Sequence, residues 1–208
     1  MSTSSYHHGD LKNALIKAGV KILAKEGVSG LSLRKVAKQA GVSHAAPYSH
    51  FVDKQALIAA ISTEGFKQLY IQIEEIRAAY KNKPKNLLVE TAWAYMQFAF
   101  NEPDRFKLMF SSVLEKEKEY PDYVESSRKN FEQIVDVVKV CQSAGVLRDD
   151  SPDLITVSVW SVVHGLVMLV LEGQISHTVL EQHDLKSMLI FTLGQMALVE
   201  LTWRIRIT

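Results

Sequence analysis

Four residues between positions 43 and 54 are predicted to bind a phosphate backbone: Tyr48, His50 and Lys54 through their side chains, and Ser43 through the N-terminus of its helix. Hydroxyl, imidazole and ammonium donors are groups that proteins commonly turn toward phosphate oxygens. Lys54 would stand in the first turn of a helix, where a cation opposes the helix dipole, so a nearby phosphate would compensate for its placement. The alternative for Tyr48 and His50 is structural, with the tyrosine packed on the first helix and the histidine capping a turn.

Four further residues are predicted to face the edges of bases: Arg34, His44, Ala45 and Ala46. Arg34 could form two hydrogen bonds with a guanine, whereas the two alanines offer only methyl contacts, for example to thymine. Because so few of these side chains are polar, we expect recognition to depend partly on the shape of the DNA.

Residues 31–54 contain the elements that would position these groups. Ser32 is a suitable N-cap for a helix over 32–40, whose apolar residues recur at helical spacing on one face. Gly41 can end that helix with a positive φ, and Ser43 can cap a second helix. Two short helices joined by a glycine turn form a helix-turn-helix, whose second helix enters the major groove of DNA.

The same segment matches a known sequence pattern. The matching residues are Leu31, Ser32, Arg34, Val36, Ala37, Ala40, Gly41, Val42, Ser43, Tyr48, His50, Phe51 and Lys54. At this spacing the segment resembles the tetracycline-repressor-like (TetR/AcrR) family of bacterial regulators. Pro47 and Ser49 depart from the family pattern on the second helix. We expect these two departures to affect the DNA sequence that is recognised rather than the fold.

The spacing of apolar residues predicts helices along the whole chain, without the alternation typical of strands. A first helix is expected over about 10–26 and a long one over about 54–80. Further helices are expected over about 86–100, 103–110, 121–144, 152–171 and 184–201. We therefore predict an all-α protein, with a three-helix DNA-binding domain in residues 1–53 and a helical ligand-binding and dimerisation domain in residues 54–208.

Residues 154–171 form an uncharged apolar run that is long enough to span a membrane. However, polar residues interrupt the run, His164 would lie deep in lipid, and neither flank is basic. A helix that is apolar all round also suits a protein core or a subunit interface, so we predict no membrane span. The resemblance implies that helices 152–172 and 184–201 pair with those of a second copy to form a homodimer.

Trp160, His164 and Gly165 resemble the Trp-x-x-x-His-Gly segment of the family subgroup named for a C-terminal Trp-His-Gly (WHG) domain. The wider family receives an inducer in a cavity between helices, which implies a small apolar or amphipathic ligand here. The candidate lining residues are Trp93, Phe98, Phe110, Trp160 and His164. In the alternative, the aromatic residues only fill the core, and His164 bonds to a backbone carbonyl or across the dimer.

Composition and charge narrow the function further. Residues 1–65 contain eight Lys and Arg against four Asp and Glu, so the basic excess lies with the helix-turn-helix. A single cysteine and no evident signal peptide favour a reducing, cytoplasmic location. No glycine-rich phosphate loop, His-Glu-x-x-His or Gly-x-Ser-x-Gly motif occurs, so we predict no catalytic residue, metal site or cofactor.

These features predict a homodimeric, DNA-binding transcription regulator, a repressor that a small ligand releases from its operator. One alternative is an architectural or protein-responsive DNA-binding regulator without a small-molecule ligand. A second alternative is an enzyme that uses the helix-turn-helix for protein contacts.

Overall fold

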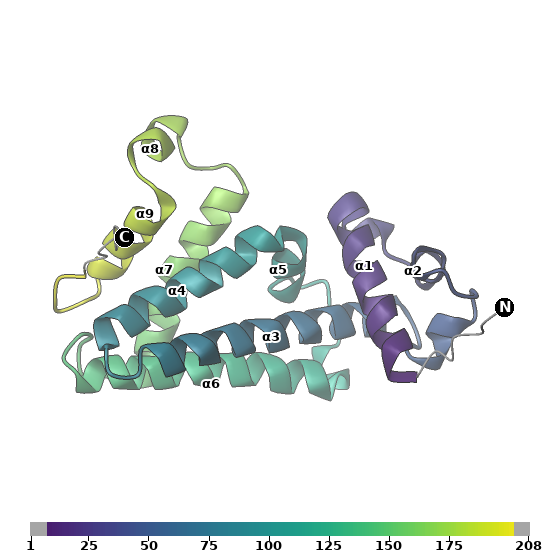
Figure 1. The fold of residues 1–208 in the computed structure, drawn as a ribbon, viewed down its shortest axis with the longest axis horizontal. Helices are drawn as coiled ribbons and strands as arrows, with labels where there is room; N and C mark the ends of the chain where they lie inside the picture. The colour runs from purple at the N-terminus through teal and green to yellow at the C-terminus, as the bar shows by residue number, and fades with distance from the viewer. Residues whose placement is uncertain (1–7, 202–208) are drawn as a thin grey trace. The chain divides into compact units, whose positions relative to one another are not determined.

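The computed structural model describes residues 8–201 of the chain, and in this range the secondary structure is helical (Figure 1). The elements are α1 (His8–Gly30), α2 (Leu33–Ala40), the 3₁₀ helix η1 (Ala46–Ser49), α3 (Lys54–Ala79), α4 (Pro84–Asn101), α5 (Pro103–Met109), the 3₁₀ helix η2 (Glu117–Glu119), α6 (Pro121–Ser143), α7 (Pro152–Leu171), α8 (His177–Gln182) and α9 (Leu185–Gly194). The described residues contain no strand, and their one β feature is an isolated antiparallel bridge between Leu147 and Ala197. The predicted all-α class is confirmed.

The helices form two compact units. The first unit contains the described residues up to Lys67 together with Glu102–Ser127. The second unit contains Gln68–Asn101 together with the described residues from Arg128 onward. The continuous helices α3 and α6 each contribute residues to both units.

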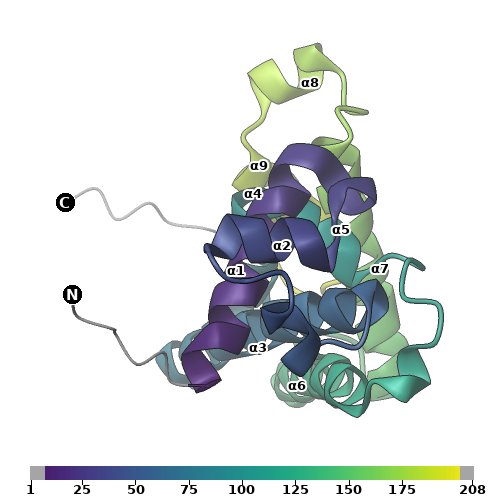
Figure 2. The same cartoon turned by 90° about the vertical axis from the view of Figure 1, so that its right-hand side faces the viewer.

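The core of the first unit lies between α1, α2, the start of α3 and α5. Its buried side chains include Leu15, Ile22, Leu23, Leu31, Val36, Phe51, Leu57, Ile61 and Leu108. Figure 2 brings α1 and α2 of this unit to the front. Gly19 allows α1 to approach α3 closely, because a Cβ atom at this position would lie 2.8 Å from Ile61 Cδ1.

Local signals in the sequence predicted several helix boundaries correctly. Gly27 has φ 65° and interrupts α1 directly after the predicted end of the first helix. Asp53 caps α3, because its Oδ1 accepts a hydrogen bond of 2.8 Å from the Ala56 N–H. Gly145, with φ 68°, follows α6. In each case the signal acts on backbone groups within one turn of the helix end.

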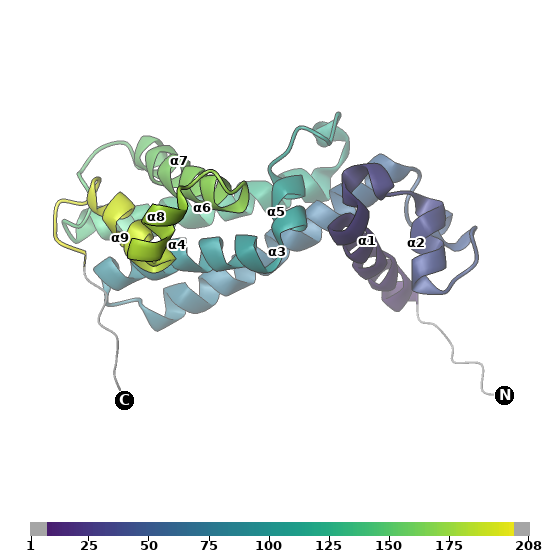
Figure 3. The ribbon, with the colours of Figure 1, turned by 90° about the horizontal axis from the view of Figure 1, so that it is seen from above.

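In the second unit, α4, α7 and α9 contact one another in pairs, and Figure 3 shows them from above. Their buried side chains include Met96, Phe98, Val159, Val163, Val167, Leu189 and Leu193. Gln133 of α6 is also buried, and its Nε2 donates to Tyr70 O at 3.0 Å and to Glu74 Oε1 at 2.7 Å on α3. These two hydrogen bonds attach α6 to the second half of α3.

The last helix is shorter than predicted. α9 ends at Gly194 instead of continuing to Leu201. Beyond it, the Leu198 N–H donates to Val146 O at 2.9 Å, and Ala197 forms the bridge with Leu147. Glycine is a weak helix former, and the pairing with the segment after α6 satisfies backbone groups that a longer helix would have bonded internally.

By length and composition, α7 is apolar enough to cross a membrane. In this fold part of its surface packs against α4 and α9 of the second unit. One side of α7 is buried through Ile155, Thr156, Val159, Val163, Leu166 and Val167.

Candidate nucleic-acid interface and ligand site

The first half of the predicted helix-turn-helix is formed by α2 and its caps. Ser32 Oγ accepts a hydrogen bond of 3.2 Å from the Lys35 N–H, which caps the helix start. Gly41 has φ 72°, and the following Val42 N–H donates to Ala37 O at 3.0 Å. This left-handed glycine turns the chain away from α2, and its predicted role is confirmed.

The second half of the motif differs from the prediction, because it is the 3₁₀ helix η1 rather than an α-helix capped by the Ser43 side chain. The Ser43 carbonyl accepts from the Ala46 N–H at 3.0 Å, and the Ala45 carbonyl accepts from the Tyr48 N–H at 3.2 Å. In an α-helix capped at Ser43, residue 47 would be the first whose N–H bonds to the Ser43 carbonyl. Pro47 has no N–H, so the tighter i to i+3 bonding replaces that bond.

Most of the predicted DNA-binding side chains lie at the surface of α2 and the segment after it. Arg34, Ser43, His44 and Ala45 are exposed, Ala46 is partly exposed, and the Tyr48 side chain is 61% exposed. Tyr48 therefore does not pack into the core of this unit. A basic side chain, hydroxyls and an imidazole on neighbouring exposed positions form a surface that is suited to phosphate and base contacts.

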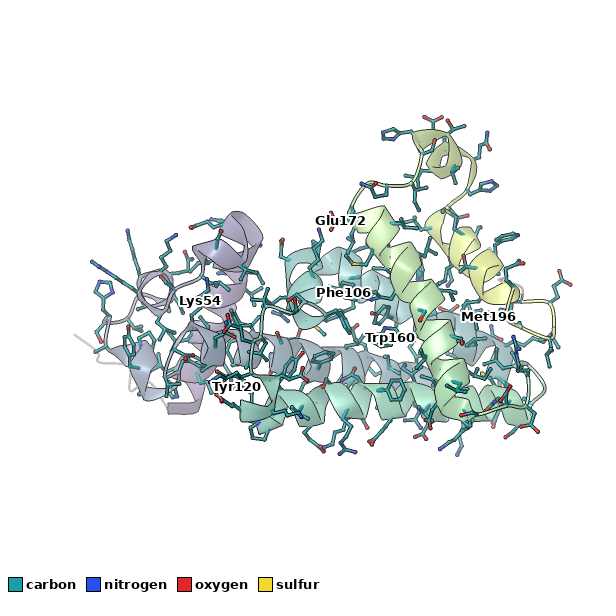
Figure 4. All side chains as sticks on the ribbon, turned by 180° about the vertical axis from the view of Figure 1, so that it is seen from behind. Lys54, Phe106, Tyr120, Trp160, Glu172 and Met196 are labelled. Carbon is teal, nitrogen blue, oxygen red and sulfur yellow. The ribbon has the colours of Figure 1, made fainter. Side chains whose placement is uncertain are left out.

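His50 and Lys54 already have contacts within the first unit. The Nε2 atom of His50 is buried, so a phosphate would have to be met by Nδ1. Lys54 Nζ donates to the carbonyl oxygen of Val28 at 2.6 Å (Figure 4 labels Lys54). An ammonium group has three N–H donors, so this bond leaves donors for a phosphate.

Val52 is a surface residue that the sequence analysis did not single out. Its side chain is 81% exposed and lies between two predicted phosphate ligands in the sequence. It lies between buried Phe51 and the capping residue Asp53. An exposed apolar side chain here can contact a sugar or a thymine methyl group.

In the second unit, Tyr95 joins two of the predicted ligand residues. Trp160 Nε1 donates to Tyr95 Oη at 3.1 Å, and Tyr95 Oη lies 2.7 Å from His164 Nδ1 (Figure 4 labels Trp160). The Tyr95 hydroxyl accepts from the Trp160 indole N–H, and the direction of its bond with His164 Nδ1 depends on the tautomer of His164. The hydroxyl of Tyr95 thus links α4 to the Trp-His pair of α7.

The remaining predicted ligand residues lie in different surroundings. Lys186 Nζ lies 5.3 Å from the centre of the Trp93 ring, and Phe98 is buried in the core of the second unit. Phe110 belongs to the first unit, where its ring centre lies 5.5 Å from that of Phe66. The tertiary structure therefore brings Trp160 and His164 together around Tyr95 and places Phe110 in an aromatic cluster of the other unit.

We expect the free energy of unfolding to decrease as the pH falls below about 6.5, the ordinary pKa of histidine, in part through His164. Burial lowers the pKa of His164 in the folded protein. The unfolded chain therefore takes up its proton at a higher pH than the folded chain, and acidification favours unfolding between the two pKa values. Urea unfolding at about pH 7.5 and about pH 5.5 should show a smaller loss for His164→Gln than for the wild type. An equal loss in both proteins would exclude His164 as the titrating group.

Comparisons with known proteins concern both parts of the chain. Residues 15–61 match "Bacterial regulatory proteins, tetR family", and residues 88–193 match "Tetracyclin repressor-like, C-terminal domain". The uncharacterized HTH-type transcriptional regulator YobS of Bacillus subtilis (strain 168) is 24% identical over 163 residues, which are 78% of this chain and 80% of YobS.

Two solved structures extend the similarity to the fold. A protein with unknown function from Rhodococcus sp. RHA1 has a TM-score of 0.76 at 28% identity, covering 94% of this chain and 100% of that chain. The TetR family transcriptional regulator PfmR from Thermus thermophilus has a TM-score of 0.63 at 19% identity. The PfmR similarity covers 84% of this chain and 97% of that chain, and it concerns the fold alone.

Proposed function

Because the chain belongs to the tetR family of DNA-binding bacterial transcription regulators, we propose that it is a homodimeric repressor that a small ligand releases from its operator. The observation that carries this proposal is the set of exposed side chains between Arg34 and Tyr48 on a capped helix-turn-helix. Binding of a regulatory ligand, rather than catalysis, is the proposed activity, and it takes place in the cytoplasm with the DNA.

In this proposal residues 1–53 bind the operator, and residues 54–208 bind the ligand and the second subunit. The proposed ligand is small and apolar or amphipathic. The linked polar groups of Tyr95, Trp160 and His164 support this assignment, because they stand among apolar side chains of α4 and α7. A few polar groups in an apolar setting are typical of small-molecule sites.

Exposed apolar side chains on α7 and α9 support the proposed homodimer. Leu154, Val157 and Leu169 of α7 are exposed, and Phe191 of α9 is 71% exposed. At Gly165 a Cβ atom would meet nothing within 4 Å, so another helix can approach α7 closely there. Exposed large apolar side chains on two neighbouring helices favour association with a second copy.

The alternative is a DNA-binding regulator without a small-molecule ligand. It is favoured by the surroundings of Phe98, which is buried in the second unit, and of Phe110, which packs against Phe66 in the first unit. Calorimetric titration with candidate ligands distinguishes the two functions, because only the ligand-released repressor binds one in the second unit.

Two substitutions test the DNA-binding part against sites selected from random DNA. Arg34→Ala should relax the preference at one base pair in each half-site, which corresponds to a loss of about 1–3 kcal/mol in discrimination.

Lys54→Ala should weaken binding to all sequences alike and reduce the slope of log affinity against log salt by about 1. Each variant is the control for the other. Equal losses on specific and random DNA for Arg34→Ala would show a phosphate contact, and an unchanged salt slope for Lys54→Ala would limit Lys54 to its bond with Val28.

A further inference from the structure

The first unit contains a hollow of about 320 Å³ that is separate from the predicted ligand residues. Its walls are α1, the first half of α3, the end of the helix-turn-helix and residues 119–123. Figure 4 labels Tyr120 in this last segment. The volume falls at the lower end of the range of about 300–1,000 Å³ that is typical of small-molecule sites.

The α3 wall of the hollow is apolar because its side chains are small. Ala56, Ala59 and Ala60 recur at i, i+3 and i+4, so they share one face of α3. Ile16 of α1 and Phe51 are buried beside them. Because the three side chains are only methyl groups, they leave space for a flat apolar molecule. Longer side chains would fill this space.

A buried polar atom lies at the same hollow. His50 lines it, and the buried Nε2 atom of His50 has no hydrogen-bond partner among the described residues. Buried polar atoms in folded proteins nearly always have a partner, so an atom like this one is suited to bonding a ligand. The Thr63 hydroxyl already donates its proton to Ala59 O at 2.7 Å, so it can only accept a hydrogen bond from a ligand.

The walls beside α3 carry opposite charges. The α1 wall contributes Lys12, whereas residues 119–123 contribute the carboxylates of Glu119 and Asp122. Burial raises the pKa of Tyr120, the nearby carboxylates of Asp53 and Glu119 raise it further, and Lys116, whose Nζ lies 3.3 Å from Glu119 Oε1, lowers it. On α3 itself, Glu64 and Lys67 balance each other. A ligand with one positive and one negative group would therefore match the two walls.

We propose that this hollow binds a small zwitterion with an aromatic body, such as an aromatic α-amino acid. The ring lies against the three alanines, the ammonium group faces Glu119 and Asp122, and the carboxylate faces Lys12. The carboxylate or ammonium group also supplies a partner for His50. Because His50 and Phe51 directly follow η1, a molecule bound here contacts the DNA-binding unit itself.

Three probes that differ only in charge test the proposal with the full chain in isothermal titration calorimetry: L-phenylalanine, 2-phenylethylamine and 3-phenylpropionate. We expect phenylalanine to bind most tightly and each singly charged probe about 5-fold more weakly, the factor expected for one exposed ion pair. Binding of none of the three, or equal affinity for phenylalanine and the amine, would overturn the proposal.

Matched variants assign the binding to this hollow. Lys12→Gln should reduce phenylalanine affinity to that of the amine, whereas Lys17→Gln, another exposed lysine on α1 that does not line the hollow, should have no effect. Ala60→Phe should fill the space and abolish binding of every probe. Unchanged phenylalanine binding in both Lys12→Gln and Ala60→Phe would place the ligand elsewhere and overturn the proposal.

The effect on DNA rests on the proposed function and is measured separately. Saturating phenylalanine should change operator affinity by at least about 5-fold, the lower end of the usual coupling between two sites. Operator binding without any ligand is recorded first with the same preparation. If the operator is bound and no probe binds, the amino-acid site fails while the DNA-binding function stands. If a probe binds and no operator is found, the proposed function fails instead.

Discussion

Replacing Phe191 with arginine should convert the proposed dimer to monomers and lower operator affinity by about 100-fold or more, the lower end of the gain from linking two binding modules. Phe191 is 71% exposed on α9, so an arginine at this position displaces no core side chain of the protomer. In a two-fold interface the same patch meets its own copy, so each subunit would bring a desolvated arginine to the contact.

The loss of DNA binding follows from geometry. A two-fold dimer places its two recognition segments in successive major grooves, about 34–36 Å apart on one face of B-DNA. Separate monomers bind the two half-sites independently, so binding of one monomer no longer increases the local concentration of the other at its half-site. Sedimentation measures the assembly, and titration of labelled operator measures the affinity.

Gln97→Arg is the matched control for Phe191→Arg. Gln97 is also exposed, and it lies on α4 rather than on the exposed apolar side chains of α7 and α9. The control should remain dimeric and bind the operator like the wild type. If Phe191→Arg also remains dimeric with normal affinity, the interface lies on another surface of the protein.

Glu90→Ala should destabilise the second unit by about 3 kcal/mol, because it leaves a largely buried lysine without its counterion. Lys186 Nζ lies 2.9 and 3.1 Å from the two carboxylate oxygens of Glu90, and the two side chains are only 11% and 14% exposed. The lysine also lies over the Trp93 ring. The pair connects α4 to the first turn of α9, so its loss should loosen the attachment of α9.

Two further proteins control this measurement in urea unfolding. Glu132→Ala breaks the ion pair between Arg128 and Glu132, in which the side chains are 52% and 54% exposed. This substitution should lower the free energy of unfolding by less than about 1 kcal/mol. Glu90→Leu combined with Lys186→Met removes both charges and should recover most of the stability lost in Glu90→Ala. Similar losses for Glu90→Ala and Glu132→Ala would show that the Lys186 pair behaves like a surface pair.

Much of the candidate DNA interface could be predicted from the sequence. Ser32, Gly41 and Asp53 determine where helices begin and end, because each acts on backbone groups within a few residues. The periodic apolar residues also identified the buried faces of α1 and α2. Even η1 depends on a local cause, the missing N–H of Pro47, although Pro47 was expected to affect the DNA sequence that is read rather than the fold.

Local signals could not determine which distant segments meet. α9 ends at Gly194 because the following backbone pairs with Val146 and Leu147, about fifty positions earlier in the chain. The sequence determined that α4 and α7 have apolar faces, but only the tertiary structure placed Tyr95 against Trp160 and His164. The periodicity of a helix specifies which of its faces is buried. The side chains that cover this face depend on contacts between segments far apart in the chain, and these form only when the whole unit packs.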